Sequence, residues 1–436
     1  MVTGLAARNG GPVCLAILAA ILLIGLGLRL DYAWEGREPV FDAAAYAEIA
    51  RNLDEGRGFE LGPGATQPAS NYSPGLPLFV AGFYEVTGGA HERGARVALA
   101  LIGALAILFA YLIGRRLSGP AAGLIGAAAV AIYPALLEYQ GMFMGEPLAA
   151  TLLSGAVLAI LWADAGQGHP ARGSCPRVRW LLPGVLLGAL TLVRPEYLGL
   201  ALLMSLVVLG RNPRDWQRVL ILLAGLALVI APWTIRNAIE LDRFVPVSTG
   251  GGQVLFAGTY LPSDGDPEKV GAEVVARHPG LFDPQDVERL RLEQILARLA
   301  AQRHPGVETD KALARMGREQ LWDDITQEPA EYAGFVATKI WRIWSQGPRE
   351  VMDRPAWKVF HWVLVALGLL GLVVLARQRR WEALLLATVF VAITAISALL
   401  VASPRRVLVL LPLVAALAGI GVAWLWTGLR ERRIRL

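Results

Sequence analysis

Two acidic residues, Asp42 and Glu146, each stand at the start of a segment whose apolar residues have helical spacing. Asp42 opens the stretch DAAAYAEIARNLD, and Glu146 opens EPLAATLLSGAVLAI. An acid at a helix start can simply cap the helix or stabilise its dipole, and that alternative stays open. A carboxylate can also accept the proton of a hydroxyl group as that group attacks a substrate. We therefore predict two catalytic residues: Asp42 as a general base, and Glu146 as a residue that positions substrate.

Three arginines lie at the ends of apolar segments. Arg194 and Arg236 each end such a segment, and Arg405 begins another, directly before Arg406. A guanidinium group binds phosphate through forked, charge-assisted hydrogen bonds. An arginine at the edge of a membrane segment also commonly extends to water without any specific ligand, so both interpretations remain. We predict that Arg194, Arg236 and Arg405 bind the phosphate of a lipid substrate.

Three further residues complete the predicted substrate-binding set. Tyr46 lies four positions after Asp42, while Tyr72 and Ser73 lie in NYSPGLPLF, where two prolines prevent a regular helix. Tyr72 either packs on a sugar or anchors the segment at a membrane surface. No metal ligands are predicted, because the five histidines are scattered and no Cys/His cluster suggests zinc. Two convergent carboxylates nevertheless leave room for a divalent metal.

The composition places all these residues in a membrane protein. Of the 436 residues 55% are apolar and 18% are charged, which is typical of a chain that crosses a bilayer many times. We predict an all-α polytopic fold with about ten transmembrane helices, over residues 12–30, 95–114, 119–137, 147–163, 180–193, 196–210, 217–234, 357–376, 382–402 and 405–427. A further apolar stretch, residues 75–86, is too short to span.

The side of the membrane that each loop faces depends on residues 75–86. If this stretch lies along the surface without crossing, the short arginine-rich loops all share one face, as the positive-inside rule requires: Arg115 and Arg116; Arg172, Arg177 and Arg179; Arg211, Arg214 and Arg218; Arg377, Arg379 and Arg380. Both termini are then cytoplasmic, and Asp42 and Glu146 both face the outside. We predict a multi-pass protein of the cytoplasmic (inner) membrane with its active site on the outer face.

Three regions follow from this topology. Residues 1–234 are predicted to form an N-terminal membrane catalytic core whose first outer loop, residues 31–94, carries two juxtamembrane helices. Residues 235–356 are predicted to form a small mixed α/β extracytoplasmic domain, because 243–260 alternates like short strands around a glycine turn while 284–303 and 309–325 are amphipathic. Residues 357–436 hold the C-terminal transmembrane helices. The net positive charge reflects orientation in the membrane, so no nucleic-acid partner is predicted.

The pattern resembles the GT-C class of integral-membrane glycosyltransferases, in particular the bacterial branch with aminoarabinose transferases and relatives of protein O-mannosyltransferases. The resemblance is carried, in order along the chain, by DAAAYAEIARNLDEGRGF, NYSPGLPLF, GRRLSG, GMFMGEPLAA, LVRPEYL and PWTIRN followed by FVPVSTGGG. Two positions depart from it: Ala43 stands where relatives often have a second acid, and Ser73 precedes Pro74 where aminoarabinose transferases have lysine.

The resemblance implies an inverting transfer of a sugar from a polyprenyl-phosphate-linked donor to the hydroxyl group of a glycan, lipid or protein acceptor. It places the catalytic carboxylate at Asp42, an acidic position of the second outer loop at Glu146, and the second juxtamembrane helix at residues 75–86. Because few ionisable residues lie inside the predicted spans, ion-coupled transport is disfavoured. A transporter or flippase of lipid-linked sugars and a non-catalytic envelope assembly protein remain the alternatives.

Overall fold

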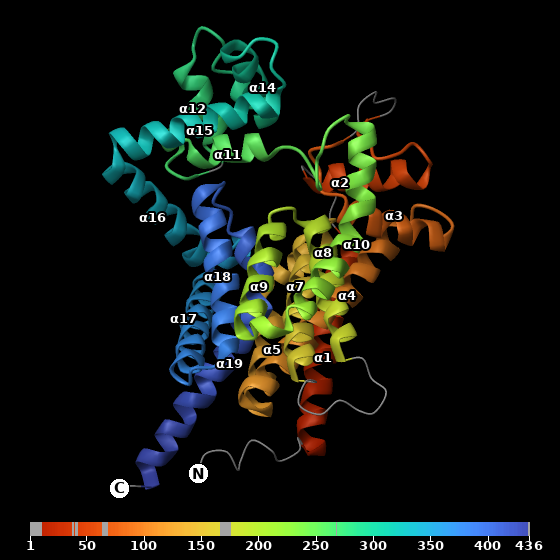
Figure 1. Cartoon of the computed structure of the whole chain (residues 1–436), viewed down its shortest axis with the longest axis vertical. Coiled ribbons are helices and arrows are strands. Elements are labelled where there is room, and N and C mark those ends of the chain that lie inside the picture. Colours follow the sequence, from red (N-terminus) through yellow and green to blue (C-terminus); the bar gives the residue numbers. More distant parts are fainter. Residues whose placement is uncertain are drawn as a thin grey trace.

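The computed structural model describes residues 11–36, 39, 42–62, 69–165, 176–266 and 268–434. Within these ranges the regular elements are all helical: a bundle of long helices carries a smaller group of short helices at one end (Figure 1). The start of α1 (Pro12–Glu35) and the end of α19 (Arg405–Ile434) both lie at the other end of the bundle, away from the short helices (Figure 1). Arg172, which the positive-inside argument uses, lies outside the described residues.

Seven of the described helices are long and apolar enough to cross a membrane, so the chain is a multi-pass membrane protein. They are α1, α4 (Glu92–Ser118), α7 (Glu146–Ala165), α10 (Gln217–Glu240), α17 (Pro355–Arg377), α18 (Trp381–Leu399) and α19. An eighth span arises if α5 (Pro120–Ile132) and α6 (Pro134–Glu138) are counted together with the turn that follows, across a bend of 54°. The predicted spans 180–193 and 196–210 are the short helices α8 (Leu181–Val193) and α9 (Tyr197–Arg211).

The bend between α5 and α6 has an identifiable cause. Pro134 has no backbone N–H, so the carbonyl group of Val130 loses its helical partner. Arg29 of α1 replaces that donor: its Nη2 lies 3.0 Å from the Val130 oxygen, and its Nη1 lies 3.2 Å from the Ala131 oxygen. The buried arginine inside the first span is therefore explained by backbone hydrogen bonding.

Helices α2 (Asp42–Asp54) and α3 (Gly75–Thr87) lie together at the end of the bundle that also carries α11 (Figure 1). Helix α3 begins against the end of α8, where a Cβ atom on Gly75 would meet the Val193 nitrogen at 2.6 Å. It ends beside the start of α4, where Phe83 packs against Gly94. Both ends of α3 thus stay at one end of the bundle, and residues 75–86 do not cross it.

The prediction of strands in residues 243–260 is wrong, because residues 251–259 form a helix and residues 243–250 are irregular. Residues 251–259 form α11 (Gly251–Thr259), whose first amide groups donate to the Asp310 carboxylate, with the Gly252 nitrogen 2.8 Å away. The extended residues before it pair with side chains of α10: Asn237 Nδ2 donates to the oxygens of Val245 and Val247. One face of this extended segment contacts a helix. Such contact involves every second residue, so it produces the same alternating sequence pattern as a strand.

The short helices beyond α10 share a small apolar core. They are α11, α12 (Val270–Arg277), α14 (Leu292–Arg303) and α15 (Thr309–Gln327), and their core contains Phe256, Val274, Leu296 and Leu313. The short helix α13 (Asp286–Arg289) lies beside α12 and has no buried residue. Helix α16 (Pro329–Ser345) leads from this group back to the bundle (Figure 1). Lys339 of α16 is buried, and its ammonium group lies 2.5 Å from the oxygens of both Gly258 in α11 and Ala398 in α18.

Replacing Lys339 with methionine should loosen the connection between α11, α16 and α18. The change keeps the length of the side chain but leaves two carbonyl groups without their donor, at a cost of about 1–3 kcal/mol each where no water can replace it. We expect a lower midpoint of thermal unfolding in detergent. Lys311→Met is the matched control, since Lys311 is exposed, and it should change the midpoint little. Equal midpoints for both variants would contradict this role of Lys339.

Candidate active site

The carboxylate of Asp42 faces a guanidinium group that comes from the far end of the sequence. Asp42 is the first residue of α2, and its Oδ2 lies 3.3 Å from Nη1 of Arg405, the first residue of α19. The side chains remain about half exposed, at 52% for Asp42 and 42% for Arg405. The pair is therefore reachable from solvent and held by two separate parts of the chain.

Glu146 occupies a different environment, because its side chain is completely buried at the start of α7. Its Oε1 lies 2.5 Å from Nη2 of Arg194, and its Oε2 has no hydrogen-bond partner among the described residues. Arg194 directly follows α8, in the short non-helical segment with Pro195 that separates α8 from α9. Burial lowers the pKa of the Arg194 guanidinium, but the charges of Glu146 and Glu196 outweigh it and raise the pKa above its ordinary value.

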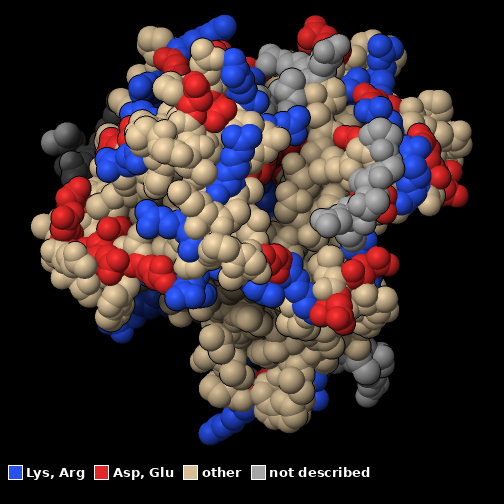
Figure 2. Space-filling model, turned by 90° about the horizontal axis from the view of Figure 1, so that it is seen from above, with Lys and Arg blue, Asp and Glu red and all other residues tan. Residues whose placement is uncertain are grey.

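A second acid and a second arginine extend this pair. Glu196 Oε1 lies 3.7 Å from Arg194 Nη1 and also 3.7 Å from Nε of Arg406. Because Arg406 follows Arg405 in α19, the two ion-pair systems meet at the start of one helix. We call Asp42, Glu146, Arg194, Glu196, Arg405 and Arg406 the charge cluster. Figure 2 looks onto this end of the molecule, where basic and acidic side chains lie intermixed.

The predicted tyrosines lie beside the charge cluster. Tyr46 is one turn along α2 from Asp42, and its ring meets that of Tyr72 edge-on with centroids 5.7 Å apart. Burial raises the pKa of Tyr46, the charge of Arg194 opposes this shift, and the Ser73 hydroxyl group hydrogen-bonds the Tyr46 side chain. The structure thus brings Tyr46, Tyr72 and Ser73 next to the predicted carboxylates.

Arg236 forms no ion pair with the charge cluster among the described residues. Near the end of α10 its guanidinium group sits 5.0 Å from the ring centre of Trp233 and 5.9 Å from that of Phe59, and it donates to Asn237 Oδ1. These are contacts of an arginine that packs on aromatic rings. Of the predicted phosphate-binding arginines, Arg194 and Arg405 come together and Arg236 stays with this aromatic group.

Sequence reasoning gave no site role to two contributors to this region, and it noted a third, Arg406, as part of the basic pair Arg405-Arg406 without including it among the site residues. Glu196 and Arg406 complete the charge cluster, and the adjacent "RPE" and "PRR" sequences were the only signals for them. Arg349, in the loop after α16, lies 2.7 Å from Glu138 Oε2 and packs over the ring of Tyr139, 6.0 Å from its centre. Nothing in the sequence around Arg349 marks it, because its partner lies more than 200 residues away.

The candidate site does not have the composition of a metal centre. The described part of the chain contains no group of three or more His, Cys, Asp or Glu side chains placed to hold a metal ion. Asp42 and Glu146 each face a guanidinium group, and the position after Asp42 is Ala43. As placed, these residues do not fit a divalent metal.

Comparison with known proteins identifies a related family for part of the chain. Residues 71–235 match the model of the dolichyl-phosphate-mannose-protein mannosyltransferase family, a range that includes Glu146 and Arg194 but neither Asp42 nor Arg405. A search among proteins with curated functions finds no match.

Solved structures extend the likeness to nearly the whole chain. The archaeal oligosaccharyltransferase AglB from Archaeoglobus fulgidus, in complex with an inhibitory peptide and a dolichol-phosphate, superposes with a TM-score of 0.58 at 16% identity, over 97% of this chain and 51% of that one. ArnT from Cupriavidus metallidurans, bound to undecaprenyl phosphate, has a TM-score of 0.41 at 17% identity over 94% of this chain and 77% of that one. The chain spans about half the length of the oligosaccharyltransferase, and it has the fold of a GT-C membrane glycosyltransferase, as its sequence predicts.

The pair of Glu146 and Arg194 should be strongly coupled. Arg194→Met leaves the buried Glu146 carboxylate without its cation, which costs about 3–5 kcal/mol, whereas the double variant Glu146→Leu/Arg194→Met removes both charges and should recover much of the loss. Thermal unfolding of the four proteins in detergent gives the cycle. Arg315→Met, which breaks an exposed pair with Glu319, should cost about 0–1 kcal/mol. Additive single changes would contradict the coupling.

Proposed function

We propose that the chain is a GT-C type glycosyltransferase that moves a sugar from a polyprenyl-phosphate-linked donor to an acceptor hydroxyl group. The reaction would take place at the outer face of the bacterial cytoplasmic membrane, with inversion at the sugar carbon. The family match over residues 71–235 and the fold likeness to AglB support this class of reaction. One observation carries the assignment of the site: Arg405 lies 3.3 Å from Asp42 and near Glu146 and Tyr139.

In this proposal Asp42 is the general base. The acceptor oxygen attacks the sugar carbon that is bonded to phosphate, and the bond from that carbon to the phosphate oxygen breaks as the new bond forms. Asp42 accepts the hydroxyl proton, and the phosphate leaves with the electron pair of the broken bond. An exposed carboxylate suits this role, because the acceptor must reach it from water.

The leaving phosphate needs positive charge where its own negative charge develops, and we assign that role to Arg405 with Arg194 behind it. Arg405 is half exposed, so a phosphate can approach its free nitrogens while one nitrogen holds Asp42. Arg194 is more enclosed and bound to Glu146, so Glu146 acts as a positioning residue for it. Tyr46, Tyr72 and Ser73 line the same region and would contact the sugar.

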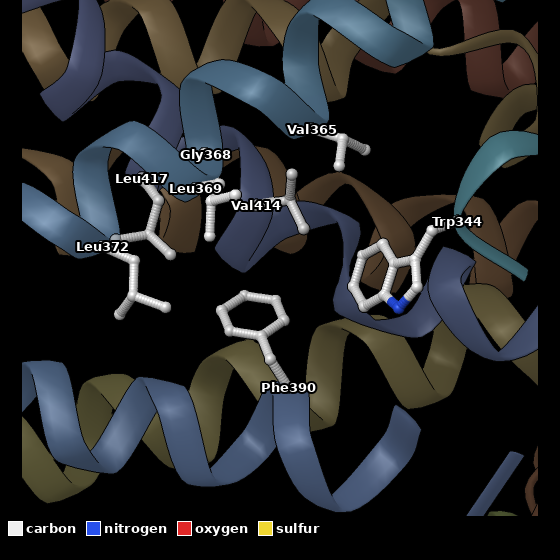
Figure 3. A pocket seen from close by; sticks show the side chains of 8 residues that line it. All are labelled: Trp344, Val365, Gly368, Leu369, Leu372, Phe390, Val414 and Leu417. Carbon is white, nitrogen blue, oxygen red and sulfur yellow. The ribbon is translucent and has the colours of Figure 1, made fainter. Parts of the chain in front are cut away.

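The lipid part of the donor has an apolar place near this site. A cavity of about 270 Å³ lies between α16, α17, α18 and α19, and Trp344, Phe390, Val414 and Leu417 line it (Figure 3). Val414 and Leu417 follow Arg405 by 9 and 12 residues in α19, hence by about 14–18 Å along the helix. A polyprenyl chain in this cavity would extend away from a phosphate at Arg405.

The helices α11–α15 stand beside the proposed active site, and we propose that residues 235–356 help to receive the acceptor. Residues 1–234 would form the catalytic core and residues 357–436 the remaining transmembrane part. Tyr72 lies within electrostatic range of Glu293 and Arg291 of this region, which supports the proposal because it brings these charged side chains close to the proposed sugar site.

Asp42→Asn should abolish most transfer and leave the fold intact. The amide keeps the shape of the side chain but cannot accept the proton, so kcat should fall about 10²–10⁴-fold. The measurement is transfer from a polyprenyl-phosphate sugar by purified protein in liposomes. Asp54→Asn, at the other end of α2, is the control. Full activity of Asp42→Asn would show that Asp42 is not the general base. Movement of lipid-linked sugar across the bilayer without formation of product would favour a flippase.

Arg405→Gln should weaken use of the donor, with a loss of roughly 10–100-fold in kcat/KM for the lipid substrate, because a charge-assisted phosphate contact of about 1.5–3 kcal/mol is removed. The effect on kcat/KM for the acceptor at saturating donor should be smaller. Arg236→Gln serves as the control, since that arginine packs on Trp233 and Phe59. A larger loss for Arg236→Gln than for Arg405→Gln would reverse the assignment of the phosphate-binding residue.

A further inference from the structure

An open crevice of about 700 Å³ lies between α4, α7 and α8, at the end of the bundle away from the charge cluster. Its walls are formed by apolar side chains, including Phe109, Leu112, Leu158 and Leu186, and its mouth carries Arg115 and Arg116. Gly155 lets the Phe109 ring, which forms one wall, pack close to α7, since a Cβ atom there would meet Phe109 at 3.0 Å. The volume is within the range of roughly 300–1,000 Å³ that is usual for small-molecule sites.

The arginines at the mouth carry positive charge that the neighbouring acids do not neutralise. Arg115 and Arg116 are exposed near the end of α4 and form no ion pair within the described part of the chain; Arg115 lies 6.0 Å from the ring centre of Tyr111. Asp164 lies near the end of α7 on the same side. It forms an ion pair with Arg211 at 2.9 Å and lies 3.8 Å from Arg218. Asp215 is bound by Arg177 at 3.2 Å.

A further cation stands beside the crevice. The guanidinium group of Arg179 lies 4.9 Å from the ring centre of Trp162, which lines the crevice with half of its surface exposed. An apolar crevice with guanidinium groups at its mouth, on the side of a membrane bundle, complements a lipid with an anionic headgroup. We propose that this crevice binds an anionic phospholipid, with its phosphate at Arg115 and Arg116 and an acyl chain along Phe109 and Leu186.

The position distinguishes this lipid from the sugar donor. Helix α4 has 27 residues and is therefore about 40 Å long. Its first turn lies near α2, where Glu92 is 3.5 Å from Arg51, and its last turn holds Arg115 and Arg116. The crevice and the charge cluster are thus on opposite membrane surfaces. A phospholipid is the abundant anionic lipid at both, whereas the proposed reaction needs its donor at only one.

Trp162 provides a direct probe of the site. The full chain is placed in nanodiscs of phosphatidylcholine that contain a minor fraction of phosphatidylglycerol with brominated acyl chains, which quench indole fluorescence on contact. The chain has 13 tryptophans, so the signal of Trp162 is taken as the difference between the chain and its Trp162→Phe variant. We expect several-fold stronger quenching by brominated phosphatidylglycerol than by brominated phosphatidylcholine at the same fraction.

The double variant Arg115→Gln/Arg116→Gln should lose this preference, and Arg115→Lys/Arg116→Lys should keep part of it because the charge remains. Arg377→Gln/Arg379→Gln is the matched control: both arginines are exposed at the end of α17, outside the crevice, and the preference should persist. Equal quenching by both lipids, or equal losses in the two glutamine variants, would overturn the proposal. Displacement of phosphatidylglycerol by an equimolar polyprenyl phosphate would also overturn it, because the occupant would then be the donor lipid. None of these readouts requires sugar transfer.

Discussion

The arrangement of the candidate site depends on one constraint: a carboxylate that is removed from water needs a cation beside it. Glu146 has no exposed surface, and Arg194 is the group that touches its Oε1. An isolated charge in such a place would cost several kcal/mol, so the position of the Arg194 side chain is strongly specified. The chain makes this possible by ending α8 at Val193 and resuming with α9 at Tyr197, which leaves Arg194 and Glu196 in the break. Two helices too short to be typical spans are therefore the structural condition for the ion pair.

The same logic extends to α19. Arg406 reaches Glu196 and Arg405 reaches Asp42, so the start of the last helix is fixed to the break after α8 on one side and to α2 on the other. Exposure rises along this series, from fully buried at Glu146 to about half exposed at Asp42. The buried groups hold the arrangement, and the exposed ones remain available for a substrate. A site built in this way separates rigidity from access, which is what a reaction between a lipid-borne and a water-borne substrate requires.

Sequence reasoning identified most of these residues individually, because position at the end of an apolar segment is visible in the sequence. It could not pair them. Asp42 and Arg405 are separated by 363 positions, and only the packed bundle brings them to 3.3 Å. Arg236, like Arg194, ends an apolar segment in the sequence. Its guanidinium group nevertheless packs on the rings of Trp233 and Phe59, and the position of Phe59 beside it could not be seen in the sequence. The prediction of strands in residues 243–260 was wrong for a related reason. The alternating residues there include Val245 and Val247, whose carbonyl groups accept hydrogen bonds from Asn237 of a helix and not from a neighbouring strand.

The arginines at the two ends of the bundle also differ in whether an acid neutralises their charge. At the end with α2, Arg194, Arg405 and Arg406 all have carboxylate partners. At the other end Arg115 and Arg116 remain without an acidic partner within the described ranges, although Asp164 and Asp215 are close enough to bind other arginines. An unpaired arginine at a membrane surface is stabilised by lipid phosphates, and a paired one is not free to bind them in the same way. The fold thus leaves the charges of Arg115 and Arg116 available to a ligand, whereas acids compensate those of Arg177, Arg211 and Arg218 at the same end. In the charge cluster every arginine has a carboxylate partner, so a phosphate bound there would share its guanidinium group with an acid.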